Sequence, residues 1–251
     1  MKKVAVLMTT TRNNDLWLKK AITSVLNQNS ADLVVHIYLY FDGCVIAPSV
    51  ANFNGHIHTA CSDKQRGMAY GLNRCIANVL KSGIWYDYIA RMDDDDLIMP
   101  DKFKKQAAFL DCNECYDFCG TRMMFINKDD DTIGYADFGE PLVTENNGRT
   151  FFDKNTGVIS IVHASVMFKS WILYELLLTY NPLIKKGSDY ELWLRLLSYG
   201  IRYGLYNEHL YKYRCHNKQL SAAHNNTKAF YNMREGLFNF YKNNQEIFLH
   251  Y

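Results

Sequence analysis

The stretch IWYDYIARMDDDD, residues 84–96, gives the clearest indication of the fold and of a ligand site. Trp85 to Met92 form a short, mostly apolar run rich in aromatic and aliphatic side chains, which is typical of a buried strand. The run ends directly in four aspartates, Asp93 to Asp96. In open α/β sheets, ligands bind beyond the carboxyl ends of the strands. We therefore expect the four carboxylates to lie at a ligand site on one edge of a sheet.

Apolar runs and helical patterns alternate along the chain before this stretch. The expected elements are strands at 4–8, 33–41 and 57–60, a helix capped by Asn13 or Asn14, and a helix starting at Met68. This alternation predicts right-handed crossovers and a parallel sheet. One edge of that sheet would gather three polar segments: Thr9 to Arg12, Asp42-Gly43 and Asp93 to Asp96.

From Phe118 onward the predicted order of elements becomes mixed. A turn at Lys128 to Asp131 separates two runs that look like a hairpin. The expected elements are strands at 121–127, 132–135 and 159–168, a helix from near Ser188, one or two short strands within 201–216, and a helix at 227–243. We therefore expect an α/β fold with a mixed, mainly parallel sheet flanked by helices, and a C-terminal helical tail.

The composition is that of an ordinary globular chain. Its 251 residues suit one large α/β domain, and a formal net charge of +2 is too small for composition alone to suggest nucleic-acid binding. The first apolar run is too short for a signal segment, and no stretch reaches the roughly 18 apolar residues of a membrane-spanning helix. The seven scattered cysteines indicate free thiols. We expect a cytoplasmic protein that does not bind nucleic acid.

The four consecutive aspartates predict a metal–phosphate site. Apolar residues flank Asp93 to Asp96 on both sides, and carboxylates held close together in such surroundings raise each other's pKa unless a cation is present. Oxygen ligands favour a hard cation, Mg²⁺ or Mn²⁺, that keeps open positions for water and phosphate oxygens. The alternative is a solvated acidic turn, which is how we interpret Asp129 to Asp131 in the predicted hairpin.

Seven blocks of this sequence resemble, in order, the motif series of family 2 glycosyltransferases of the GT-A fold. They are the strand at 4–8, the Asp42-Gly43 turn, GMAYGLN at 67–73, ARMDDDD at 90–96, PDKF at 100–103, HASVMF at 163–168 and DYELWLR at 189–195. The resemblance covers residues 3–221. It implies a Rossmann-like GT-A domain at 1–221, with a nucleotide-sugar-binding half at 1–117 and an acceptor and catalytic half at 118–221. Residues 222–251 would form a helical extension.

The resemblance implies roles for the acidic residues of the donor site. Asp93 would contact the ribose or sugar side of the donor, and Asp95 would bind the metal that bridges the diphosphate. Asp96 would support them, with the register within the four aspartates open by one residue. Asp42 matches the acid that reads the nucleotide base, commonly the N3–H of uracil, for which a carboxylate is a suitable acceptor. The other candidates for donor binding are Thr9, Thr11, Arg66 and Asp94.

Two of these positions leave the details of donor recognition open. Thr11 stands where the family usually has an aromatic residue that stacks on the base. Arg66 stands where the family often has a basic or polar contact to the donor, and it equally suits a solvated arginine at a helix start. A UDP-sugar is the expected donor, with the stacking partner of its base unassigned.

Asp189 matches the catalytic base of the family. It would accept the proton of the acceptor hydroxyl while that oxygen attacks the anomeric carbon opposite the leaving nucleoside diphosphate, which inverts the configuration. Ser188 stands where an acid usually precedes the base, and Asp189 alone would also suit a carboxylate stabilised by a helix dipole. Arg214 and His216 resemble the late Tyr-Arg-x-His segment that approaches the metal or diphosphate, although such a histidine is often structural. His163 would border the acceptor site.

These features predict a Mn²⁺- or Mg²⁺-dependent inverting hexosyltransferase with a glycan or lipid-linked acceptor. The resemblance implies a setting in bacterial surface-polysaccharide, lipopolysaccharide or O-antigen synthesis. One alternative is a nucleotidyltransferase, which would usually carry a glycine-rich loop after its first strand, where this chain has no glycine. The other is a non-catalytic metal- or carbohydrate-binding module. The basic, aromatic tail either contacts the inner face of a membrane peripherally or packs on the domain.

Overall fold

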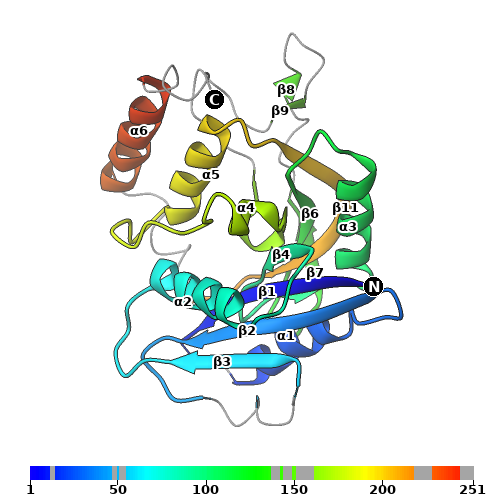
Figure 1. The fold of residues 1–251 in the computed structure, drawn as a ribbon. Helices are drawn as coiled ribbons and strands as arrows, with labels where there is room; N and C mark the ends of the chain where they lie inside the picture. Colours follow the sequence, from blue (N-terminus) through cyan, green and yellow to red (C-terminus); the bar gives the residue numbers. More distant parts are fainter. Residues whose placement is uncertain are drawn as a thin grey trace.

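A mixed sheet of nine strands forms the centre of the molecule (Figure 1). The computed structural model describes residues 1–11, 15–46, 50, 55–136, 142–143, 149–150, 161–217 and 228–243. The strands are β1 Lys2–Thr10, β2 Leu33–Phe41, β3 Ile57–Cys61, β4 Tyr88–Arg91, β5 Leu97–Ile98, β6 Phe118–Ile126, β7 Thr132–Tyr135, β8 Leu142–Val143, β9 Arg149–Thr150, β10 Met167–Lys169 and β11 Tyr203–Arg214. The helices are α1 Asp15–Leu26, α2 Met68–Lys81, α3 Lys102–Cys112, α4 Trp171–Tyr174, α5 Ser188–Ser198 and α6 Lys228–Asn243.

The parallel half of the sheet confirms the prediction from alternating strands and helices. The strand order is β3-β2-β1-β4-β10-β6-β11-β5, and the first four of these strands are parallel. Val4 and Val6 of β1 belong to the core cluster that includes the apolar face of α1, while Ala5 and Leu7 belong to the cluster around α2. Helices therefore cover both faces of β1, which is why the strand is a continuous apolar run. The predicted caps Asn13 and Asn14 lie outside the described residues.

The second half of the sheet corrects two predictions. The predicted hairpin is present, but residues 203–214 form one long strand, β11, which runs parallel to β6 with register shifts between Tyr206 and Tyr211. The strand predicted at 159–168 is confirmed only at Met167 and Phe168, and the described residues before them are not a strand. His163–Ser165 form a 3-10 turn, and only β10 follows as a strand, antiparallel to β4 and β6. The hydroxyl and the amide of Ser165 both donate to the carbonyl of Val162, which closes a turn in place of a ladder.

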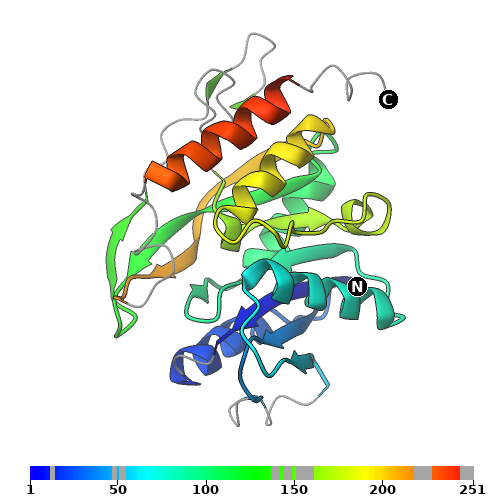
Figure 2. The same cartoon turned by 90° about the vertical axis from the view of Figure 1, so that its left-hand side faces the viewer.

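The C-terminal helix α6 packs on α5, and the two lie side by side in Figure 2. Phe238 and Leu237 of α6 contact a cluster with Tyr190 and Leu194 of α5. The Tyr241 hydroxyl donates to Glu191 Oε1 at 2.7 Å. This confirms that the tail packs on the domain. No helix in the described part of the chain is both long enough and apolar enough to cross a membrane.

Candidate active site

The carboxyl ends of β1, β2 and β4 meet at one edge of the sheet, as predicted. Thr10 is paired with Phe41, and the amide of Asp42 donates to the Thr10 carbonyl at 2.8 Å. The amide of Met92 donates to the Leu7 carbonyl at 3.1 Å. Thr9 and Thr10 are the last two residues of β1, and Thr11 follows directly. Parallel pairing therefore brings three segments that are distant in sequence to one place, whereas Arg12 lies outside the described residues.

Asp42 fixes the loop before α2. Its Oδ1 accepts from the amide of Arg66 at 2.7 Å, and its Oδ2 accepts from the amide of Gly67 at 2.8 Å. Gly67 has a φ of 94°, a conformation that favours glycine. The exposed Arg66 guanidinium lies 5.2 Å from the centre of the Tyr70 ring. Asp42 thus has a structural role at the site, and its predicted contact with a base stays a prediction, since a carboxylate can accept further hydrogen bonds.

Arg91, the last residue of β4, is a buried cation beside the acidic run. Its guanidinium forms an ion pair with Asp93, and its Nη2 lies 3.2 Å from the sulfur of Met68 in α2. The Arg91 side chain is 2% exposed and that of Asp93 is 34% exposed. A buried guanidinium requires a compensating carboxylate, so this pair orients Asp93 at the rim of the site.

The next two aspartates have raised pKa values because they are buried and lie near other carboxylates. Burial and the neighbouring charge of Asp95 raise the pKa of Asp94 to about 7, although a hydrogen bond from Thr10 opposes the rise. Burial and the charge of Asp93 raise the pKa of Asp95, while its bond with His216 opposes this. The distance from His216 Nε2 to Asp95 Oδ2 is 2.8 Å. Buried carboxylates with other negative charges nearby favour the approach of a cation.

Asp96 and Arg214 lie behind the run and hold it in place. Asp96 is 1% exposed; its Oδ1 accepts from the Arg214 amide at 2.7 Å, and its Oδ2 accepts from the Tyr211 hydroxyl at 2.5 Å. The Arg214 guanidinium is completely buried. Its Nε donates to the carbonyl of Asp95 at 2.6 Å. Asp96 and Arg214 are therefore buried and bonded to each other and to the backbone of the acidic run, and their predicted contact with the acceptor or diphosphate stays a prediction.

Asp189, the candidate base, is the second residue of α5. Burial raises the pKa of Asp189, against hydrogen bonds from the backbone amides of Tyr190 and of Asp189 itself and against the positive charges of Arg91 and Arg234. Arg91, the ion-pair partner of Asp93, thus also favours the ionised form of Asp189. A carboxylate whose pKa is raised is a stronger proton acceptor, as a general base requires.

His163 and Tyr180 form a buried pair next to these charges. His163 Nε2 lies 2.8 Å from the Tyr180 hydroxyl. Burial and the charge of Arg91 hold the pKa of His163 well below its ordinary value, so the ring is neutral. Burial also raises the pKa of Tyr180, as do the charges of Asp189 and Asp93, against that of Arg91. His163 is on a turn and does not begin a strand, and its predicted position at the acceptor site stays a prediction.

Comparison with known proteins identifies the family. The model of Glycosyl transferase family 2 matches residues 6–173, more than half of the chain. The chain belongs to this family. The glycosyltransferase is 28% identical over 251 residues to the O-antigen biosynthesis glycosyltransferase WbnJ of Escherichia coli, covering 93% of this chain and 89% of WbnJ. It is 25% identical over 219 residues to the uncharacterized glycosyltransferase MJ1057 of Methanocaldococcus jannaschii, covering 86% of this chain and 71% of that protein.

A solved structure confirms the GT-A-like fold. S. aureus TarS 1-349 in complex with UDP-GlcNAc matches the glycosyltransferase with a TM-score of 0.70 at 14% identity. The match covers 96% of this chain and 66% of that chain, so the glycosyltransferase spans about two thirds of the length of its structural relative. Membership of the family supports a glycosyltransferase over a nucleotidyltransferase or a non-catalytic module.

Reasoning from the sequence gave no role to three residues of the glycosyltransferase site. Arg91 carries a signal, because a charged residue in a buried strand requires a partner. Tyr180 carries no such signal. Its backbone is fixed by two hydrogen bonds of 2.8 Å with the side chain of Asn73 in α2, a residue 107 positions away in sequence. Trp17 of α1 lies 4.9 Å from His216, ring centre to ring centre. Long-range packing places Tyr180 and Trp17, and no local pattern indicates it.

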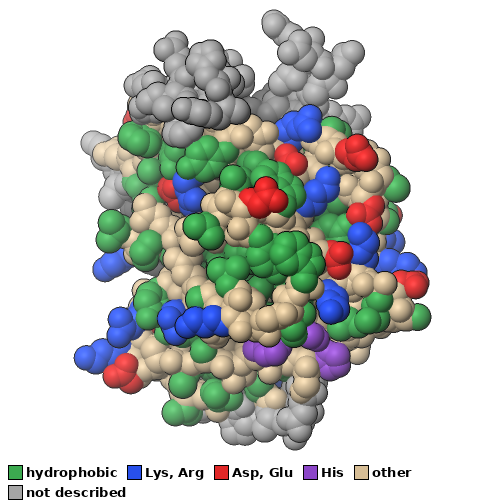
Figure 3. All heavy atoms as spheres, viewed as in Figure 1, with side chains coloured by type: hydrophobic (Ala, Val, Ile, Leu, Met, Phe, Trp, Pro, Cys, Tyr) green, Lys and Arg blue, Asp and Glu red, His purple; other side chains and the backbone are tan. Residues whose placement is uncertain are grey.

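Histidines also gather away from the site, over β2 and β3 (Figure 3). The His36 ring centre is 5.5 Å from that of His56 and 5.6 Å from that of His58. Burial lowers the pKa of His36 and of His58, which favours neutral rings. Within the described residues, no group of three or more His, Cys, Asp or Glu side chains is arranged to hold a metal. A cation at the aspartates would therefore need oxygen ligands from the substrate or water.

Proposed function

We propose that this glycosyltransferase moves a sugar from a UDP-sugar to a hydroxyl of a glycan or lipid-linked acceptor and inverts the anomeric configuration. The observation that carries the proposal is the position of Arg91. This buried cation is the ion-pair partner of Asp93 in the acidic run, and its positive charge also favours the ionised form of Asp189 on α5. We therefore assign the donor-side carboxylates and the candidate base to one site.

The acceptor hydroxyl would lose its proton to Asp189. The hydroxyl becomes acidic only as its oxygen bonds to the anomeric carbon, so a positioned carboxylate is sufficient as a base. The bond to the leaving nucleoside diphosphate breaks on the opposite face. The ionised carboxylate of Asp189 is held at the start of α5 by backbone amides, and the charges of Arg91 and Arg234 favour this form. The helix dipole adds to the same effect.

We propose that Asp95 and His216 hold Mn²⁺ or Mg²⁺ when the donor is bound. The fit rests on the donor set: Asp95 Oδ2 and His216 Nε2 lie 2.8 Å apart, and the pKa values of Asp94 and Asp95 are raised by burial and by neighbouring negative charge, which a cation would offset. Mg²⁺ sites commonly use one or two side chains together with water and substrate phosphates. The cation would stabilise the negative charge that develops on the diphosphate.

Relatives support the donor and the setting of this proposal. TarS, which shares the fold, has been solved with UDP-GlcNAc and with UDP. WbnJ, the relative that matches over most of both chains, is described as an enzyme of O-antigen biosynthesis. We therefore propose surface-polysaccharide synthesis on the cytoplasmic side of the membrane, with contact to the membrane through the lipid-linked acceptor.

A screen of nucleotide sugars tests the proposed donor. We expect a UDP-sugar to raise the melting temperature of the protein in the presence of Mn²⁺, and to do so less in EDTA, because the cation joins the diphosphate to the protein. GDP-, CMP- and dTDP-sugars serve as controls. A stabilisation that is equal for all nucleotides, or equal with EDTA, contradicts the proposed donor site.

The charge of Arg234 in α6 should affect the pKa of the candidate base Asp189 and so the pH dependence of sugar transfer. Its guanidinium lies 4.4 Å from the Tyr190 ring centre, and its charge lowers the pKa of Asp189. Arg234→Met removes that charge, so the pKa of Asp189 should rise further and the acid limb of the kcat profile should move to higher pH. Arg234→Lys keeps the charge and should stay near the original profile. The pH dependence of sugar transfer measures this, and identical acid limbs in all three proteins would refute it.

A further inference from the structure

The second acidic run, Asp129 to Asp131, lies in the predicted hairpin turn, and Asp129 and Asp131 are exposed as expected, but Asp130 is only partly exposed. Asp129 is exposed and pairs with Lys128 at 3.1 Å. Asp130 adopts a φ of 75°, and its carboxylate lies between two cations. Its Oδ1 is 2.6 Å from Arg214 Nη2, and its Oδ2 is 2.5 Å from Lys20 Nζ.

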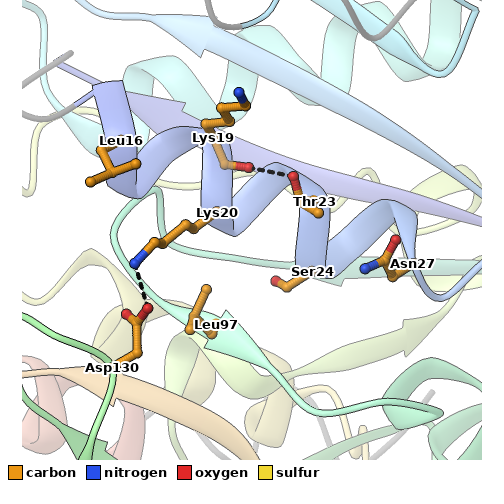
Figure 4. A pocket seen from close by; sticks show the side chains of 8 residues that line it. All are labelled: Leu16, Lys19, Lys20, Thr23, Ser24, Asn27, Leu97 and Asp130. Atoms are coloured by element: carbon orange, nitrogen blue, oxygen red, sulfur yellow. Dashed lines mark hydrogen bonds and ion pairs between the residues drawn. The ribbon is translucent and has the colours of Figure 1, made fainter.

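Figure 4 shows Lys20 reaching from α1 to Asp130 across an open groove of about 400 Å³. The groove is lined by Leu16, Lys19, Lys20, Thr23, Ser24, Asn27, Leu97 and Asp130. The β6–β7 turn therefore contacts α1 through Lys20 and Asp130, which are 110 residues apart in sequence.

Arg214 connects this turn to the donor-side aspartates. The same guanidinium that pairs with Asp130 donates through Nε to the carbonyl of Asp95 at 2.6 Å and through Nη1 to that of Asn127 at 2.8 Å. It also lies 5.0 Å from the centre of the Trp17 ring, which contacts His216. The backbone of Asp95 is thus bonded to the buried Arg214, and the ring of His216 contacts Trp17, the aromatic neighbour of Arg214.

The charge of Asp130 is what allows Arg214 to stay buried. The Arg214 side chain has no exposed surface, and removing one partner of a buried pair leaves an uncompensated charge. Partial burial of Asp130 favours its neutral form, but the bonds from Lys20 and Arg214 lower its pKa below the ordinary value, so it is ionised. Without Asp130, the guanidinium would be drawn toward the carboxylates of the acidic run.

We propose that Asp130 is a positioning residue of the donor site: through Arg214 it holds Asp95 where a metal–diphosphate would be bound. This inference rests on the proposed function. Because Asp189 lies on α5, a separate element, loss of Asp130 acts on binding of the donor and the cation more than on the proton transfer. Residues that orient metal ligands typically change metal affinity or activity about 10- to 100-fold when they are replaced.

Two matched substitutions in one turn test the proposal. Asp130→Asn should raise the KM for the UDP-sugar and the Mn²⁺ concentration for half-maximal transfer by about tenfold or more, with a smaller change in kcat. Asp129→Asn removes the same charge one residue earlier and should leave both values within about twofold, as expected of an exposed pair. All assays are run below the melting temperature of each variant.

Each result supports or overturns the inference. A purely structural role would lower the melting temperature of Asp130→Asn and leave the KM and the Mn²⁺ requirement unchanged, which overturns the proposal. If Asp130→Asn does not fold, Asp130→Glu keeps the charge but displaces the carboxylate, and it should show an intermediate Mn²⁺ requirement; an unchanged requirement overturns the proposal. Failure of the unaltered protein to bind any UDP-sugar with Mn²⁺ overturns the proposed function and this inference with it.

Discussion

Asp189→Asn is expected to lower the rate of sugar transfer about 10²- to 10⁴-fold, the usual contribution of a general base, while the donor still binds. The amide is nearly the same size as the carboxylate but cannot accept the proton of the acceptor hydroxyl. The donor-side carboxylates are on a different element, the loop after β4, so they should keep their arrangement. Product formation from UDP-sugar and acceptor measures the rate, and calorimetric titration with UDP and Mn²⁺ measures binding.

A carboxylate far from the site controls for the loss of a negative charge. Glu114 is exposed and follows α3, so Glu114→Gln should retain the original rate. Full transfer activity in Asp189→Asn would remove the proposed mechanism. Loss of UDP binding in the same variant would assign Asp189 to the donor site instead of the acceptor side.

Asp95→Asn is expected to abolish turnover of the donor, with a loss of transfer of about 10²-fold or more, because the substitution removes a proposed ligand and leaves one fewer charge to bind the cation. The bond between Asp95 and His216 would also change, since an amide replaces the acceptor oxygen or offers a donor. UDP titrations with and without Mn²⁺ should show that the gain in affinity from the metal disappears.

Asp129→Asn is the matched control for this second prediction, because it also neutralises one member of an acidic run. Its exposed carboxylate pairs with Lys128, so activity and the effect of Mn²⁺ should stay near their original values. A metal-dependent rate in Asp95→Asn equal to that of the unaltered protein would show that the cation is held elsewhere or is not required.

Part of the site follows directly from local sequence patterns. The edge of the sheet was predicted because parallel strands align their carboxyl ends, and this places Asp42 beside Thr10 regardless of side-chain detail. Asp189 was expected at a helix start, where α5 begins at Ser188. Of the strand predicted at 159–168, the described residues before Met167 are not a strand, because the hydroxyl of Ser165 donates to the Val162 carbonyl, a local hydrogen bond that apolar periodicity does not reveal.

Local patterns in the sequence are sufficient to predict the family and the edge of the sheet at which the aspartates lie, because apolar periodicity and ordered motifs are local properties. The contacts of each carboxylate come from the tertiary fold. Asp96 is buried and bonds to Arg214, 118 residues away, while Asp95 faces His216. Asp130 points inward because the cations of α1 and β11 converge on it. Roles within an acidic run depend on which distant charges the fold brings near, and the run's own spacing does not specify them.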